Sequence, residues 1–171
     1  MKSIAKVLLL AALVLGLAGI VMAETGEDTQ TVTITFYEIS EIAASGDPGP
    51  LLIEAPLTPG DLPEDDTDAS TTMAWTSNVA AGLTRKITGS IDVLFSGINL
   101  YATIAAPGDA GGTSEDELLF AAADTDYEFV TAIGNCNVTA QTITFRAEVT
   151  EMVTPYEETE QIVTWTLIED A

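Results

Sequence analysis

Residues 139–150 read TAQTITFRAEVT, and this stretch decides the fold class. From Ile143 to Val149 the odd positions are apolar and the even positions are polar. A period of two is typical of a β-strand that has one face on a core and the other in water. The same alternation recurs along the chain, so we expect an all-β protein.

Further alternating stretches predict strands along the rest of the sequence. They cover residues 31–37, 71–79, 87–95, 98–104, 127–133 and 161–168, and residues 118–123 fit either a strand or a helical turn. The two stretches that flank Ser96 and Gly97 predict a hairpin over residues 86–105. About eight short, mainly antiparallel strands predict a single β-sandwich, Ig-like or jelly-roll-like, with a barrel as the alternative.

The predicted core contains the apolar residues that share one face in the strongest strands. These are Val32, Ile34, Phe36, Trp75, Ile91, Val93, Leu100, Ile104, Ile143, Phe145, Val149, Trp165 and Leu167. Between the strands, residues 45–50, 56–68, 107–112 and 134–137 are rich in Gly, Pro, Asn or Asp, which predicts turns and exposed loops.

The N-terminus predicts a signal peptide over residues 1–23, followed by a secreted domain over residues 24–171. Two lysines precede an uncharged apolar run of 16 residues from Val7 to Met22, and Ala23 ends a signal-peptidase site. The run is shorter than the roughly 20 residues of a membrane-spanning helix. We therefore expect a secreted or cell-surface protein, and an uncleaved anchor is the alternative.

The secreted domain is strongly acidic. Removal of the two N-terminal lysines leaves three basic residues against 27 acidic ones, a net charge of −24. A surface of this charge repels nucleic acid and anionic membrane, so neither is an expected partner. High salt or divalent cations would relieve the self-repulsion, and simple solubility is the alternative explanation.

Few residues have the chemistry of a catalytic site, and we expect no enzyme. The chain has no histidine, which excludes Ser-His-Asp, Cys-His and zinc-His sites. Asp124-Thr125-Asp126 lacks the glycine of an aspartic protease triplet. Cys136 is the single cysteine and is expected to be buried and inert, with an intermolecular disulfide as the alternative. Asn137-Val138-Thr139 matches a glycosylation sequon.

Two acidic loops are candidates for calcium binding, although no other cofactor is expected. Hard cations take several oxygen ligands from flexible loops, but the spacing here is not that of an EF-hand, and solvated loops are the alternative. The candidate ligands are Glu64, Asp65, Asp66, Asp68, Glu115, Asp116 and Glu117. A sugar-binding platform would need exposed aromatic side chains, whereas Trp75 and Trp165 lie on the apolar faces of their strands.

A signal peptide, short Thr- and Ala-rich strands, Gly/Pro/Asp loops and the lack of catalytic residues form one overall plan. This plan resembles secreted β-sandwich subunits of surface filaments and biofilm matrices, such as TasA-type fibre proteins and chaperone-usher-like pilins. The resemblance implies a structural or adhesive extracellular component. The alternative is a carbohydrate- or calcium-binding module of the cell surface.

The expected partners are copies of the same chain or other surface proteins, joined by strand addition through residues 24–37. An acidic leader is followed there by a strongly alternating strand, which suits a tethered strand that completes a neighbouring sheet. The alternative is that residues 31–37 pair within their own domain, which would bury Val32, Ile34 and Phe36 in its core.

Overall fold

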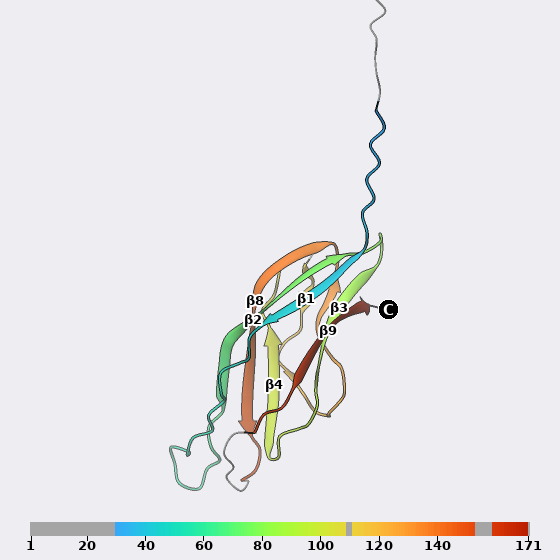
Figure 1. Ribbon diagram of the computed structural model, residues 1–171. Coiled ribbons are helices and arrows are strands. Elements are labelled where there is room, and N and C mark those ends of the chain that lie inside the picture. The colour runs from blue at the N-terminus through green and yellow to red at the C-terminus, as the bar shows by residue number, and fades with distance from the viewer. Residues whose placement is uncertain (1–29, 109–110, 153–158, 171) are drawn as a thin grey trace, which may run out of the picture. The chain divides into compact units, whose positions relative to one another are not determined.

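The computed structural model describes residues 30–108, 111–152 and 159–170 (Figure 1). The chain divides between Phe36 and Tyr37 into two units, an N-terminal segment and a body, and we describe each by itself. The described residues include no helix with the length and apolar character needed to cross a membrane. The predicted signal peptide, residues 1–23, lies outside the described residues.

The body is a β-sandwich of two antiparallel sheets, as the sequence predicts. One sheet has five strands in the order β1-β2-β8-β4-β6, and the other has four in the order β5-β7-β3-β9. The strands are β1 Ile39–Ser45, β2 Asp66–Asn78, β3 Thr84–Ile91, β4 Ile98–Ile104, β5 Thr113–Ser114, β6 Leu118–Leu119, β7 Tyr127–Ile133, β8 Cys136–Val149 and β9 Val163–Asp170.

Strand β8 lies at the centre of the five-stranded sheet, between β2 and β4. Its alternation has the predicted effect: Ile143 and Phe145 are 1% and 5% exposed on the inner face. Phe129 and Leu167 of the other sheet belong to the same buried cluster. The core therefore sits between the two sheets, and each strand contributes the residues of one parity.

Most of the predicted core is confirmed. The buried members are Trp75, Ile91, Leu100, Ile104, Ile143, Phe145, Val149 and Leu167. Trp165 is half-buried and packs against this cluster, with its ring centroid 4.9 Å from that of Phe129. Val93 is 52% exposed and was wrongly placed in the core, because β3 ends at Ile91 and Val93 lies in the loop that follows.

The predicted hairpin over residues 86–105 is wrong, because β3 and β4 belong to different sheets. The loop between them crosses from one sheet to the other. Asp92 fixes this loop, since its carboxylate accepts hydrogen bonds from the backbone N–H groups of Val93 and Ile162. The alternating pattern indicates only that each strand has one face on the core. Two strands of a hairpin and two strands of opposite sheets both meet this condition.

One strand and two strand boundaries also differ from the prediction. Strand β1, residues 39–45, had no alternating apolar signal and was missed. Strand β2 begins at Asp66, within the predicted exposed loop 56–68, because its first residues pair with β8. Strand β8 begins at Cys136, within the predicted turn 134–137, because Cys136 pairs with Ser77 of β2.

The strand predicted at residues 31–37 does not form in the described chain. Residues 30–38 belong to no strand, and Val32, Ile34 and Phe36 are 78%, 83% and 76% exposed, so they are not core residues. The edge of the five-stranded sheet is occupied instead by β1, which pairs with β2 over its whole length. The alternation at residues 31–37 describes a strand that has no partner here.

The same tetrapeptide, Thr-Ile-Thr-Phe, occurs at residues 33–36 and at residues 142–145. In β8 its isoleucine and phenylalanine are almost fully buried, whereas in the N-terminal segment Ile34 and Phe36 are more than three-quarters exposed. Identical residues with identical strand propensity therefore stand in opposite environments. Residues 33–36 therefore have the sequence of a core strand, but their apolar side chains are exposed.

We predict that the two phenylalanines of this tetrapeptide differ sharply in their effect on stability. Phe145→Ala should lower the free energy of unfolding by about 3–5 kcal/mol, because it opens a cavity between the sheets. Phe36→Ala, the matched control, should change the unfolding of the monomer by less than about 0.5 kcal/mol. Urea unfolding at low protein concentration measures both, and equal losses would contradict the assignment of only Phe145 to the core.

Candidate functional site

Arg146 organises a polar cluster on the outer face of the five-stranded sheet. It follows the buried Phe145 in β8, so its side chain points away from the core. Its guanidinium bonds Glu117 through Nε at 2.8 Å and Nη2 at 2.6 Å, and bonds Asp65 through Nη1 at 2.6 Å. Its Cζ also lies 4.1 Å from the centroid of the Tyr101 ring, in cation–π geometry.

Tyr101 extends this cluster along the sheet. Its hydroxyl donates to the carboxylate of Glu148 at 2.6 Å, and Asn99 Nδ2 donates to the same oxygen at 3.3 Å. The hydrogen bond from Tyr101 holds the pKa of Glu148 below its usual value, and the bond to that carboxylate raises the pKa of Tyr101. Tyr101 and Arg146 are directly paired across β4 and β8, so the sheet register itself brings these groups together.

The calcium candidates do not converge on one point. Asp65 and Glu117 come from different loops and meet at Arg146, a cation. Asp66 accepts the backbone N–H groups of Leu52 and Thr67, at 2.6 and 2.8 Å. Asp68 accepts the N–H and hydroxyl of Ser70, which hold its pKa below the usual value. The remaining candidates, exposed on their loops, are Glu64, Glu115 and Asp116.

Within residues 30–108, 111–152 and 159–170, no three Asp, Glu, Cys or His side chains are grouped closely enough to hold a metal ion. Two of the candidate carboxylates, Asp65 and Glu117, are instead bound by a guanidinium. The other two, Asp66 and Asp68 at the start of β2, accept N–H or O–H donors of residues 52, 67 and 70. Asp65 and Glu117 therefore fix their loops to the outer face of the five-stranded sheet. A calcium role for them stays a prediction from the sequence.

The cluster predicts a change of stability with pH. Arg146 holds the pKa of Glu117 below its ordinary value of 4.5. A carboxyl with a lowered pKa in the folded state stabilises the fold above that ordinary value, and the contribution disappears as the pH falls through the lowered value. Glu117→Gln should therefore reduce stability at neutral pH, by less than about 1 kcal/mol because the pair is solvent-exposed.

Thermal unfolding at neutral pH and at a pH well below 4.5 measures this effect. The variant and the parent protein should differ at neutral pH and coincide at the acid pH. Glu115→Gln is the matched control, since it removes the same charge from the same loop without removing a partner of Arg146. An equal loss in the control would assign the effect to net charge alone.

The sequence features with possible covalent chemistry lie apart from this cluster. Cys136 is a free, half-buried thiol, and burial raises its pKa, which favours the unreactive form. Asn137 of the sequon has an exposed side chain on β8. A shallow depression beside them is lined by Pro107, Gly108, Gly111 and residues 135–139 and 141, none of which carries a charged side chain.

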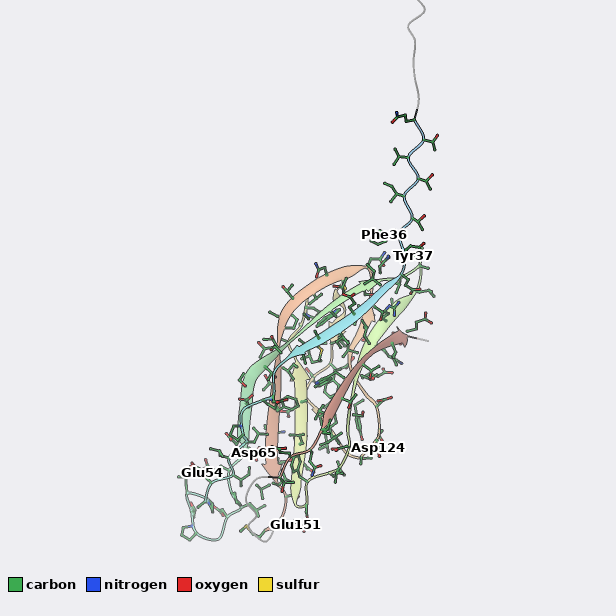
Figure 2. The ribbon with its side chains drawn as sticks, viewed as in Figure 1. Phe36, Tyr37, Glu54, Asp65, Asp124 and Glu151 are labelled. Atoms are coloured by element: carbon green, nitrogen blue, oxygen red, sulfur yellow. The ribbon has the colours of Figure 1, made fainter. Side chains whose placement is uncertain are left out.

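The first two residues of the body, Tyr37 and Glu38, are held by its strands. Asn78 Nδ2 donates to the carbonyl oxygen of Tyr37 at 3.0 Å, and the Arg85 guanidinium donates to the carboxylate of Glu38. Arg85 is only 7% exposed, so Glu38 supplies the anion that a buried cation requires. Tyr37 lies two residues before β1, at the end of the body opposite Asp65 and Glu151 (Figure 2).

The sequence did not predict the ion pairs of the three basic residues, although one signal pointed to them. The predicted secreted chain has three basic residues among 27 acidic ones, so each base has many candidate partners. All three form ion pairs: Arg85 with Glu38, Lys86 with Glu128 and Asp170, and Arg146 with Asp65 and Glu117. The sequence could not assign the partners, which are up to 81 residues away.

Comparisons with protein families, with curated proteins and with solved structures find no match to this chain. The functional argument therefore rests on the geometry above. Two features stand out: the polar cluster around Arg146, whose groups are engaged with one another, and the N-terminal segment, whose apolar side chains are exposed.

Proposed function

We propose that this chain is a non-catalytic extracellular structural subunit, a component of a surface filament, matrix or cell envelope. Copies of the chain, or this chain and other surface proteins, associate by strand addition through residues 24–37. The observation that carries the proposal is the exposed copy of the core tetrapeptide at residues 33–36.

Exposed apolar side chains of this size are stabilised when a partner surface buries them. Full burial of a side chain such as valine, isoleucine or phenylalanine stabilises by about 1.5–3 kcal/mol each. Val32, Ile34 and Phe36 share one face of an extended chain, so a single sheet could bury all three together. The backbone groups of the same residues would gain the hydrogen bonds of a ladder.

The polar face of the segment suits the same role. Thr31, Thr33 and Thr35 alternate with the apolar residues, and threonine is favoured on the solvated face of a sheet. A segment that served only as a soluble linker would not need three large apolar residues at a period of two. The pattern is therefore that of a strand, and strand addition supplies the missing sheet.

The hydrogen bonds of Tyr37 and Glu38 would connect a bound segment firmly to the body. Their hydrogen bonds to Asn78 and Arg85 tie the two residues that directly follow the segment to β2 and to β3, one strand from each sheet. A neighbour that holds residues 30–36 would thereby be linked to both layers of the sandwich. This is a suitable connection for a subunit of a load-bearing assembly.

An extracellular setting and a non-catalytic role are supported by the sequence. Residues 1–23 have the charge and apolar pattern of a signal peptide. The absence of histidine from the chain removes the commonest general base and metal ligand. The acidic surface keeps dilute subunits apart, so association should strengthen as salt screens the charge.

Deletion of residues 24–36 tests the proposal. The deletion retains Tyr37 and Glu38, so β1 keeps its anchors and the body should fold with an unchanged thermal transition. The full-length secreted protein should form multimers in high salt, whereas the truncated protein should stay monomeric by light scattering. A synthetic peptide of residues 30–37 should bind the truncated protein in trans.

A pair of triple variants separates strand addition from other effects of the segment. Replacement of Val32, Ile34 and Phe36 by threonine keeps strand propensity but removes the apolar face, and should abolish multimers. Replacement of Thr31, Thr33 and Thr35 by serine, the matched control, should leave them intact. A full-length protein that is monomeric at every concentration, or a truncated protein that still assembles, would refute the proposed function.

A further inference from the structure

We propose that the acceptor for this segment is the outer edge of β9 in a second copy of the chain, residues 163–170. The inference rests on the proposed function and names the surface that completes it. It assigns residues 30–37 of one copy as a fifth strand beside β9, at the end of the four-stranded sheet of the next.

Among the strands of the described residues, two long ones form sheet edges. In the order β1-β2-β8-β4-β6 the edge strands are β1 and β6, and in the order β5-β7-β3-β9 they are β5 and β9. Strands β5 and β6 contain two residues each, too short to template an added strand. Strands β1 and β9 contain seven and eight residues, and they lie near each other along one side of the body.

The side chains of β9 fit the segment, whereas those of β1 do not. Val163, Trp165 and Leu167 face the core at a period of two, the spacing of the three apolar residues of the segment. On β1 the only large apolar residues are Ile39 and Ile42, three positions apart, so they point to opposite faces. An added strand with one apolar face can continue the inner layer only at β9.

Residues 163–167 read VTWTL and residues 32–36 read VTITF, so the two segments share one pattern. When the three apolar positions are matched, Ile34 stands opposite Trp165 whichever way the strands run. Thr33 and Thr35 then stand opposite Thr164 and Thr166 on the solvated face. Aromatic–β-branched and Thr–Thr pairs are among the favourable cross-strand pairs.

The core beside β9 is incompletely covered. The Trp165 ring packs at 4.9 Å from Phe129 and 6.3 Å from Phe145, yet the residue is only half-buried, as is Val163 at the start of the strand. Inner strands such as β8 bury the corresponding positions almost fully, because strands flank them on both sides. An added strand would give Trp165 the second neighbour that it lacks.

Geometry favours a second copy over the chain's own β9. Glu38 binds Arg85, which is paired with Glu169, so the start of β1 lies by the end of β9 and the two strands run in opposite directions (Figure 1). To reach its own β9, the segment would have to reverse direction within Tyr37 and Glu38, between Phe36 and the first residue of β1. The tightest strand reversals use two residues, and here both of them are already bound to the body, Tyr37 by Asn78 and Glu38 by Arg85.

Cysteine cross-linking between two variants tests the acceptor, in a Cys136→Ser background and in high salt. One chain carries Thr33→Cys, and its partner carries either Thr164→Cys or Thr166→Cys; a short bifunctional thiol reagent then joins thiols that are adjacent. We expect a cross-linked heterodimer with one of the two β9 variants, and the preferred variant reports the strand direction. Ala43→Cys on the competing edge β1 is the control and should give none.

The outcomes separate the two levels of the proposal. Multimers that cross-link Thr33→Cys to Ala43→Cys, or to neither β9 variant, would refute the β9 edge and leave strand addition standing. A single chain that carries Thr33→Cys together with Thr164→Cys or Thr166→Cys and cross-links only within itself would refute a second copy as the occupant. A protein that stays monomeric throughout would refute the proposed function and this inference together.

Discussion

A strand with one apolar face is stable only where a second layer covers that face and neighbouring strands bond its backbone. Strand β8 meets both conditions, since β2 and β4 flank it and the four-stranded sheet covers Ile143 and Phe145. Residues 33–36 repeat its tetrapeptide and meet neither condition within the described chain. The proposed function follows from this single difference.

The rest of the body is arranged so that the sandwich stands without the segment. Strand β1 completes the five-stranded sheet, and the pair of Glu38 with the buried Arg85 ties its start to the other sheet. On the outer face, Arg146 draws Asp65 and Glu117 from two loops onto the sheet. Each of these basic side chains thus neutralises part of the negative surface charge. Each also holds a loop or the start of a strand in place.

The period-two pattern was sufficient to predict the fold class and most of the core, because burial of one face leaves a direct trace in the sequence. It could not predict the sheet to which each strand belongs. The stretches around Ser96 and Gly97 read as a hairpin, yet the loop crosses between sheets. Nor could it identify the partner of residues 31–37, because a strand that faces a neighbour's core has the same pattern as one that faces its own.

Hydrogen exchange of the full-length secreted protein, followed by mass spectrometry below and above the concentration at which it assembles, tests the central claim most directly. Amides of residues 30–37 should exchange rapidly in the dilute protein and become protected on assembly, together with those of β9. Protection of residues 30–37 already in the dilute monomer, or their continued rapid exchange within the multimer, would contradict this account.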